Sequence, residues 1–314
     1  MEEDAAGKIV IVKLYAVSDY RIWKKRAYLC CQCKRNWCMK KMAIMFCCFN
    51  RKQQTEKCLE TIYSQKNNLE DIKVDIYAYD DGSTDATAEM IRQFYPDIKV
   101  TRGRGNAYWC RSMYNLMKKV RTLSYDFYLM INDDVLFFDN ALQIMLETYN
   151  LANTHAGIVG ACRSAVTGKQ TYGGRSRKGS LVVPNKQLQE CFWANWNCFL
   201  IDNYIVEHVG IIDGKFQHAF GDFEYSNRMN KYGFKIFSSV DYVGECEDNS
   251  KEGTYVDMNV PRMIRLKKLI SPKGIPLYSY FRYNLKIYGA KGMPLSVYGY
   301  CSLIYYILTG KDLS

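Results

Sequence analysis

Two adjacent carboxylates follow a short apolar run near the middle of the chain. Asp133 and Asp134 come after residues 126–131, which read DFYLMI, with Asn132 between. Carboxylates at the end of a buried strand are costly unless a positive charge neutralises them. A divalent cation does so, and oxygen ligands suit Mg²⁺ or Mn²⁺. Such a cation can hold a diphosphate and stabilise the charge on a departing phosphate group. A plain turn and helix cap would also explain these residues.

A second acidic segment follows another apolar run. Residues 80–85 read DDGSTD and come directly after residues 73–79. The carboxylates of this segment can accept hydrogen bonds from a nucleobase or a ribose, and its glycine permits a tight turn. We expect Ser83 or Thr84 to cap a helix over residues 85–95. Turn chemistry explains either acidic cluster alone, but two of them at strand ends predict a binding site.

A third segment, residues 221–228, reads GDFEYSNR. Asp222 falls at an expected helix start, where the helix dipole stabilises its anion. A carboxylate at the mouth of a site can take a proton from an attacking hydroxyl group. Glu224 and Arg228 are four residues apart, so we expect them to pair on the helix surface. An N-capped helix with one surface ion pair would explain the same letters.

The elements that must position these clusters alternate between strand and helix. Strands are expected at 42–48, 73–79, 97–101, 126–131 and 156–162, and helices at 52–66, 85–95, 107–122 and 139–152. This alternation predicts an α/β fold with right-handed βαβ units and a mostly parallel sheet flanked by helices. Ligands bind beyond the carboxyl ends of such strands, so the clusters are expected to be neighbours in space. Later elements are expected as loops or a hairpin at 163–189, a strand and a helix within 191–209, a helix at 221–232, a strand at 234–239, and helices at 257–270, 276–289 and 294–308.

Taken in order, these segments resemble the family 2 glycosyltransferases, which have the Rossmann-like GT-A fold. The first element of that family is similar to Phe49-Asn50-Arg51 here. The Asp-Asp-Gly-Ser-x-Asp-x-Thr motif of the family is met without a gap by residues 80–87. The DxD-type metal motif matches residues 132–134, and the motif that supplies the catalytic base matches residues 221–228. The resemblance spans about residues 42–250.

The resemblance implies a role for each matched position. Asp134 would bind Mn²⁺ or Mg²⁺, Asp222 would be the catalytic base, and Asp81 would contact the nucleobase. The other nucleotide-binding residues would be Phe49, Asn50, Arg51, Asp80, Asn106, Trp109 and Asp133. Residues 105–109 are similar to a Gly-Asn-x-Tyr-Trp element of rhamnosyltransferase-like members. The implied mechanism is a direct displacement that inverts the anomeric carbon.

Three departures from the family pattern bear on these roles. Asn132 stands at the first DxD position, and Gly221 and Glu224 replace the usual Glu and Asp of the base motif. Many relatives also place a late His near the phosphates. The chain offers Glu245 or Glu247 in that region, so one of these glutamates would take the role of the His, or neither does.

Basic residues are concentrated at the two ends of the chain. Residues 1–41 hold ten Lys/Arg against four Asp/Glu, and residues 261–314 hold nine against one. A nucleic-acid-binding protein would more often carry a basic stripe on its central fold. The pattern fits a centre that holds a metal and ends that touch an anionic surface, or else plain solvated charge. The longest apolar stretch of the tail, residues 294–308, is short for a membrane span. We expect the tail to lie in a membrane interface or to pack on the catalytic domain.

Thirteen cysteines and no secretory signal favour a reducing, cytoplasmic compartment. Four of them crowd together as Cys30, Cys31, Cys33 and Cys38. Zinc sites usually use two separated pairs, so this spacing weighs against one. We expect residues 1–41 to be an N-terminal extension outside the fold, for which an upstream start codon would account. The predicted domains are then this extension, a GT-A domain at 42–256 and a basic, aromatic helical region at 257–314.

Together these features predict an inverting, metal-dependent glycosyltransferase. Its donor would be a UDP- or dTDP-linked sugar, and its acceptor a hydroxyl of a saccharide or a lipid-linked saccharide. It would act in capsular or cell-surface polysaccharide synthesis, in the cytoplasm or at the inner face of the membrane, without a nucleic-acid partner. Two alternatives stay open. One is an inactive nucleotide-sugar-binding protein, and the other is a nucleotidyltransferase, which would normally carry a Gly-rich basic loop after the first strand.

Overall fold

The computed structural model describes residues 39–69 and 71–311. The chain divides into two units, Met1–Cys38 and Met39–Ser314. The predictions for the N-terminal extension and for the cluster of four cysteines therefore lie outside the described residues, apart from residues 39–41.

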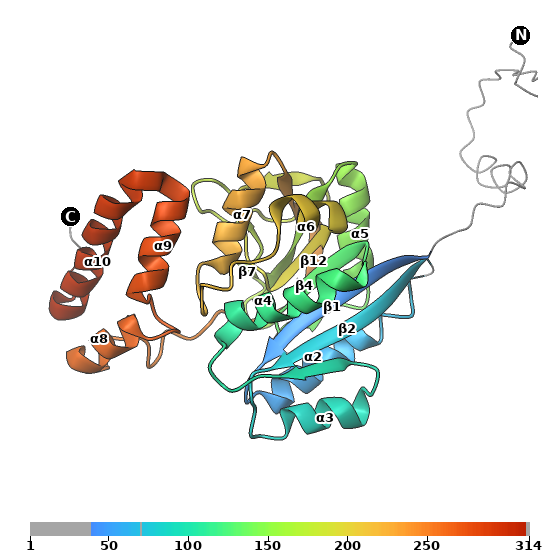
Figure 1. The fold of residues 1–314 in the computed structure, drawn as a ribbon, viewed down its shortest axis with the longest axis horizontal. Helices are drawn as coiled ribbons and strands as arrows, with labels where there is room; N and C mark the ends of the chain where they lie inside the picture. The colour runs from blue at the N-terminus through green and yellow to red at the C-terminus, as the bar shows by residue number, and fades with distance from the viewer. Residues whose placement is uncertain (1–38, 70, 312–314) are drawn as a thin grey trace, which may run out of the picture. The chain divides into compact units, whose positions relative to one another are not determined.

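A ten-stranded mixed sheet forms the centre of the described unit (Figure 1). Its strands are β1 (Lys40–Cys48), β2 (Ile72–Asp80), β3 (Lys99–Arg102), β4 (Phe127–Ile131), β5 (Leu136–Phe137), β6 (Ala156–Arg163), β7 (Gln170–Tyr172), β9 (Gln189–Cys191), β11 (Cys198–Asp202) and β12 (Lys235–Glu245). The main order is β3-β2-β1-β4-β11-β6-β12-β5, with β7 beside β6 and β9 beside β12. β1 pairs in parallel with β2 and β4, whereas β11 lies antiparallel between β4 and β6. β8 (Gly174–Arg175) and β10 (Trp193–Ala194) form a separate pair.

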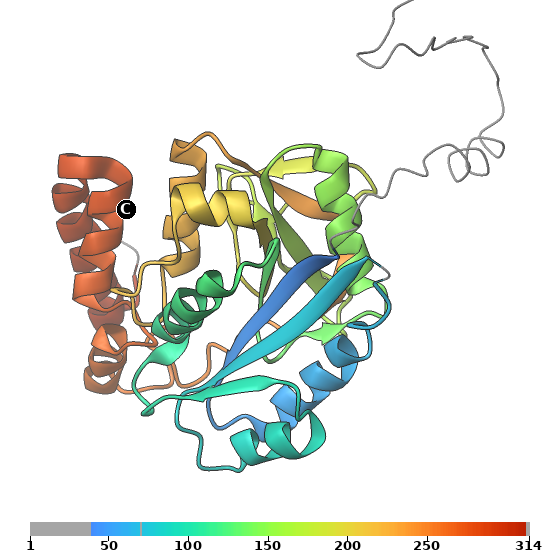
Figure 2. The same cartoon turned by 45° about the vertical axis from the view of Figure 1, so that its right-hand side comes forward.

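Helices cover both faces of this sheet, as Figures 1 and 2 show. They are α2 (Lys52–Tyr63), α3 (Thr87–Phe94), α4 (Tyr108–Val120), α5 (Ala141–Ala152), α6 (Asn203–Val209) and α7 (Gly221–Lys231), with a 3₁₀ turn at Arg121–Leu123. Side chains on β1 alternate between two apolar clusters because successive strand residues point to opposite faces. Ile44 and Phe46 pack with α2, α3 and α5, while Ala43 and Met45 pack with α4, α6 and α7. The predicted α/β fold, a mostly parallel sheet between helix layers, is confirmed.

Three further helices follow the sheet: α8 (Arg262–Ile270), α9 (Leu277–Tyr288) and α10 (Gly292–Thr309), with a 3₁₀ turn at Gly289–Lys291. They share a small apolar cluster around Leu269, Tyr300 and Ile307. Within the described residues, no helix is both long enough and apolar enough to cross a bilayer. The expected tail helices are present, whereas the domain boundary at residue 256 stays a prediction.

The elements differ from the expected ones mainly at their ends. The helix expected at 257–270 begins only at Arg262, because Pro261 disfavours the helical conformation at the residue before it. The strand expected at 234–239 continues to Glu245, where it pairs with the short β5. These differences leave the positions of the three motifs at the strand and helix ends unchanged.

The expected cap of α3 is wrong. Neither Ser83 nor Thr84 caps the helix, and its N-cap residue is Ala86 in the left-handed region, with φ 63°. The Asp85 carboxylate instead accepts the Thr87 N–H at 3.1 Å. Ser83 and Thr84 instead form hydrogen bonds with Asn50, in the segment that follows β1. These tertiary contacts replace the local capping that was expected.

Candidate functional site

An arginine after β1 reaches the acidic pair after β4. Arg51 Nη1 lies 3.0 Å from Asp133 Oδ1, and Nη2 lies 2.7 Å from Asp134 Oδ2. Thr55 of α2 donates to the second oxygen of Asp133 at 3.2 Å. Asp133 is 3% exposed, and burial raises its pKa to about 7 although Arg51 opposes that shift. The side chain of Asp134 is 22% exposed. Asp133 is therefore an internal anchor, while Asp134 keeps an open side.

Asp134 is the residue of this group that can hold a divalent cation. In the described ranges, no three His, Cys, Asp or Glu side chains converge on one point. A cation here would take one carboxylate from the protein and its other ligands from phosphate oxygens and water. Mg²⁺ is commonly held in this way. The residues present therefore fit Mg²⁺ or Mn²⁺ brought in with a diphosphate, and do not form a closed metal cage.

Cys246 lies beside Asp134, in the region where Glu245 or Glu247 was expected to take the role of the late His. Cys246 Sγ is 3.8 Å from Asp134 Oδ1. Glu245 instead lies 3.5 Å from Arg163, and Glu247 is exposed. Burial raises the pKa of the Cys246 thiol to about 12, so the group beside the open carboxylate is neutral. Sequence reasoning missed this residue because a buried cysteine reads as a small hydrophobe.

The segment after β1 is tied to the acidic segment after β2. Asn50 adopts a left-handed conformation, with φ 50°, and its side-chain oxygen accepts the Thr84 N–H at 2.7 Å. In return, the Asn50 N–H donates to Ser83 Oγ at 2.9 Å. Phe49 is 42% exposed at the same edge. The sheet thus brings together the first two motifs, as their positions at parallel strand ends predicted.

Asp80 and Asp81 have different surroundings. Asp80 is fully buried, and its Oδ1 accepts the Ser83 N–H at 2.9 Å. Asp81 accepts three backbone N–H groups at 3.1, 2.9 and 2.9 Å, those of Gly105, Ala107 and Tyr108. These bonds order the loop that carries the exposed Asn106. The role of Asp81 in contacting a nucleobase stays a prediction, and its observed role is to shape this loop.

Two tryptophans connect that loop to the acidic pair and to α7. Trp109 Nε1 donates to Asn132 Oδ1 at 2.8 Å, so the residue before the acidic pair is fixed from α4. The ring of the buried Trp196 lies 6.0 Å from Trp109 and 5.1 Å from Tyr225 of α7, edge to face in both cases. Trp196 was not predicted, because only the sheet order places its segment between α4 and α7.

Asp222 lies in the first turn of α7, after a strained residue. Phe220 has φ 75°, a conformation that is rare for bulky side chains and often marks a functional position. The ring of Phe220 stacks on Tyr283 of α9, with the centroids 5.1 Å apart. Asp222 Oδ1 accepts the Phe223 N–H at 2.9 Å, and burial raises the pKa of this carboxyl to about 6. A carboxyl group with this pKa, two residues after a strained position, is suited to general base catalysis near neutral pH.

Close packing explains why a glycine precedes Asp222. A Cβ added at Gly221 would lie 2.3 Å from Cys110 Sγ and 3.0 Å from Ile212. Real Cβ atoms essentially never approach so closely, so the Glu usual at this position of the family motif would require the Cys110 and Ile212 side chains to move. The departure noted in the sequence therefore reflects the close packing of α4 against α7.

The prediction that Glu224 and Arg228 pair is confirmed, but the prediction that they do so on the helix surface is wrong. They do pair, with Arg228 Nε 2.9 Å from Glu224 Oε1, but Glu224 is 2% exposed. Arg228 also donates to the carbonyl of Val209 at 2.8 Å, and Lys286 of α9 lies 2.8 Å from Glu224. The pair is buried because α6 and α9 cover this side of α7. The tail thus packs on the catalytic unit, one of the two arrangements expected.

Replacing Arg228 by Met should lower the free energy of unfolding by about 3 kcal/mol, because Glu224 would keep only Lys286 as a partner for its buried charge. Urea denaturation measures this loss. Arg92→Met is the matched control, since Arg92 is half exposed and lies 4.0 Å from Glu89. It should change stability by less than about 0.5 kcal/mol. Equal losses in the two variants would show that the buried pair is not special.

Comparison with known proteins agrees with this geometry. The sequence model of the family described as "Glycosyl transferase family 2" matches residues 43–218, more than half of the chain. The poly-beta-1,6-N-acetyl-D-glucosamine synthase of Staphylococcus epidermidis is 26% identical over 115 residues, which are 34% of this chain. The chain therefore matches 25% of the length of that curated relative.

Solved structures also align with the described unit. TarS 1-349 of S. aureus aligns with a TM-score of 0.52 at 11% identity, over 86% of this chain and 81% of that chain. The same fragment in complex with UDP aligns with a TM-score of 0.50 at 11% identity, over 79% and 70%. At such low identity the likeness shows a common fold.

Proposed function

The chain belongs to glycosyl transferase family 2, and from that premise we propose that it is an inverting glycosyltransferase whose donor is a nucleoside diphosphate sugar. The observation that carries the proposal is the arrangement at the carboxyl ends of β1, β2 and β4. There Arg51 pairs with Asp134, next to the loop held by Asp81. Asp222, in the first turn of α7, supplies a carboxyl group with a raised pKa. The fold that positions them is the GT-A fold.

The donor would bind with its nucleoside toward the segments after β1 and β2. Phe49 offers an exposed ring, and Asn106 and Trp109 border the loop that Asp81 orders. An aromatic ring can stack on a base or a sugar face. Three residues would support the site without contacting the donor directly. Asp80 and Asn50 hold the backbone of the acidic segment, and Asp133 holds Arg51.

The diphosphate would lie between Arg51 and Asp134. Arg51 is 41% exposed, so it can turn one N–H toward a phosphate oxygen while another stays on Asp133. A bound Mg²⁺ or Mn²⁺ on Asp134 would neutralise the charge that the departing diphosphate acquires. The TarS fragment is solved with UDP, which supports a uridine diphosphate as the first donor to test.

Asp222 would act as the general base. Its carboxylate takes the proton of the acceptor hydroxyl while the hydroxyl oxygen forms a bond to the anomeric carbon. The bond from that carbon to the diphosphate oxygen breaks, and the electron pair leaves with the diphosphate. Attack and departure occur on opposite faces of the sugar, so one base and no covalent intermediate produce inversion. With a pKa of about 6, most Asp222 is ionised at neutral pH and ready to accept the proton.

The acceptor would be a saccharide, free or lipid-linked, of a capsular or cell-surface polysaccharide. The curated relative is a synthase of such a polymer, which supports this class. The tail supports contact with an anionic membrane surface, since α8 to α10 expose apolar side chains and no acidic residue occurs between Asp257 and Asp312. Binding of the chain to anionic vesicles but not to neutral vesicles would support that contact.

A thermal-shift panel of UDP, dTDP, GDP and CDP, each with and without Mn²⁺, tests the proposed function. UDP or dTDP with Mn²⁺ should raise the stability by ~2.7 kcal/mol at a hundredfold excess over its dissociation constant. A nucleotide that binds in a chain with no transferase activity would favour an inactive nucleotide-sugar-binding protein. Stabilisation by nucleoside triphosphates above all others would favour a nucleotidyltransferase. If no nucleotide shifts a cooperative melt, the donor-site proposal fails.

A further inference from the structure

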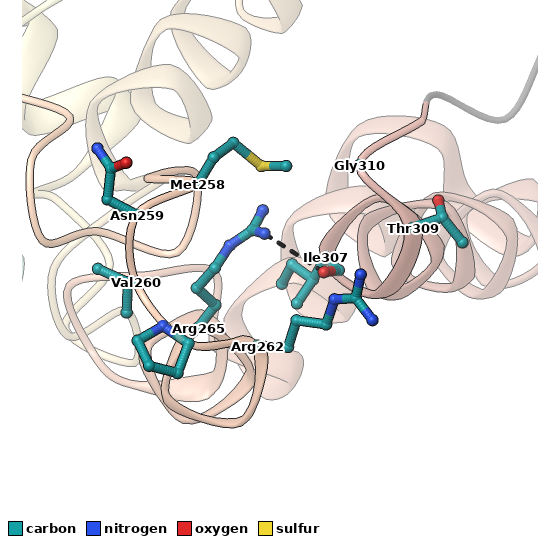
Figure 3. A pocket seen from close by; sticks show the side chains of 9 residues that line it. Met258, Asn259, Val260, Arg262, Arg265, Ile307, Thr309 and Gly310 are labelled. Carbon is teal, nitrogen blue, oxygen red and sulfur yellow. Dashed lines mark hydrogen bonds between the residues drawn. The ribbon is translucent and has the colours of Figure 1, made fainter.

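A pocket lies between the start of α8 and the end of α10 (Figure 3). Its volume is about 260 Å³. The residues around it are Met258, Asn259, Val260, Pro261, Arg262, Arg265, Ile307, Thr309 and Gly310. Among the described residues, its lining holds two arginines and no carboxylate, and none of these residues belongs to the proposed donor site. A pocket with this composition is suited to an anion.

Arg265 is the buried charge of this pocket. It is 2% exposed, and its Nε and Nη1 donate to the carbonyls of Tyr255 and Ile307 at 2.8 and 3.3 Å. Nη2 is buried and has no acceptor among the described residues. Asp257 makes no hydrogen bond to Arg265. Its oxygens accept the N–H groups of Gly253 and Asn259 at 2.6 and 2.9 Å, and these bonds, with a smaller contribution from the Arg265 charge, lower the pKa of its carboxyl. A guanidinium left with an unused buried donor is costly unless a ligand completes its hydrogen bonds.

Two more sources of positive potential meet at the same place. The first turn of α8 contains no acidic residue, and no side chain caps the helix. The uncapped N–H groups of a helix N-terminus attract anions. Arg262 is exposed in that first turn, where an arginine is electrostatically unfavourable without a counterion. In Figure 3 the side chains of Arg262 and Arg265 both extend toward the end of α10.

Exposed apolar side chains lie at the pocket and next to it. Met258 lines the pocket and is 58% exposed, while Met263 and Ile264 of α8, outside the lining, are 68% and 46% exposed. In Figure 3 the free end of Arg265 points toward Met258. Methionine is unbranched and rotates easily, so Met258 can swing aside and open the path to Nη2. The two arginines could bind a phosphate group, and the exposed apolar side chains at and next to the pocket could contact an apolar group attached to that phosphate.

We propose that this pocket binds a phosphate group, carried by a membrane lipid or by a soluble phosphate ester. Phosphate suits it better than a carboxylate does, because its oxygens can serve two guanidinium groups and a helix N-terminus together. The proposal does not rest on the transferase function, since α8 and α10 carry the pocket and the donor site lies on other elements. A lipid phosphate here would anchor the tail to a membrane.

The test compares Arg262→Glu with Lys267→Glu in the full chain. Both residues are exposed on α8, but only Arg262 lines the pocket, so the two variants change the charge equally. Binding of inorganic phosphate is measured by calorimetry. Binding to phosphatidylcholine vesicles is measured by co-sedimentation, with phosphatidic acid or with oleate as the anionic component. Oleate supplies negative charge without an additional phosphate.

Arg262→Glu should weaken binding about tenfold more than Lys267→Glu does, since it removes a charge-assisted hydrogen bond to the ligand. This difference with inorganic phosphate identifies a soluble phosphate as a sufficient ligand. The same difference only with phosphatidic acid vesicles, and not with oleate vesicles, identifies a lipid phosphate. Equal behaviour of the two variants toward every probe, or no binding to any of them, would overturn the proposal.

Discussion

Asp222→Asn is expected to lower kcat by roughly 10²–10⁴-fold, the usual contribution of a general base. Asparagine has nearly the same shape but cannot take the proton of the acceptor hydroxyl. The affinity for the nucleoside diphosphate should be unchanged, because Asp222 faces the acceptor in the proposed arrangement. Initial rates of sugar transfer and a thermal shift with the diphosphate measure the two quantities on the same preparation.

The pH dependence of transfer gives a second readout for Asp222. Burial raises the pKa of its carboxyl to about 6, so kcat of the wild-type chain should fall as the pH drops through 6 and the carboxyl becomes protonated. This inflection should be missing from the residual activity of Asp222→Asn. A variant that loses activity but keeps the inflection would assign the base to another residue.

Loss of activity in Asp222→Asn should not come from unfolding. A carboxyl whose pKa is raised in the folded state favours folding most when it is protonated, and this contribution is lost as the pH rises through the folded-state pKa. The neutral amide avoids the cost of burying the ionised form at neutral pH. Asp222→Asn should therefore melt no lower than the wild type at pH 7, and a large drop would mean that the carboxylate has a structural role.

Asp134→Asn is expected to abolish the metal-dependent part of nucleotide binding, the second large effect. The amide keeps the size of the side chain but loses the charge that holds a divalent cation. Transfer should fall by roughly 10²-fold or more, because nothing then neutralises the departing diphosphate as well. The measurements are the thermal shift with UDP, with and without Mn²⁺, and the rate of transfer.

Asp139→Asn is the matched control for this variant. Asp139 is exposed and lies five residues further along the chain, and among the described residues no side chain forms an ion pair or hydrogen bond with it. It should leave both the shift and the rate unchanged. If wild type binds UDP equally well with and without Mn²⁺, and Asp134→Asn does too, then Arg51 alone neutralises the diphosphate and the metal is not needed.

The sequence determined much of the fold because its signals are local. The continuous apolar run at residues 42–48 predicts β1, and the polar clusters that follow such runs predict where a ligand would bind. The ends of parallel strands lie at one edge of the sheet, so Asn50 and Thr84, 34 residues apart, could be expected to meet. The resemblance to the family 2 glycosyltransferases rests on local patterns of the same kind, taken in order, and most specifically on residues 80–87.

The tertiary structure decided what those residues contact. Cys246 lies beside Asp134 although 112 residues separate them, because β12 enters the sheet late in the chain. Glu224 is buried because α6 and α9 cover α7, and Gly221 is favoured because Cys110 of α4 packs closely against the same helix. Periodicity says which residues form a helix, whereas burial depends on which distant segments cover it. The pocket at Arg265 has the same origin, since its carbonyl partners come from the chain before α8 and from the far end of α10.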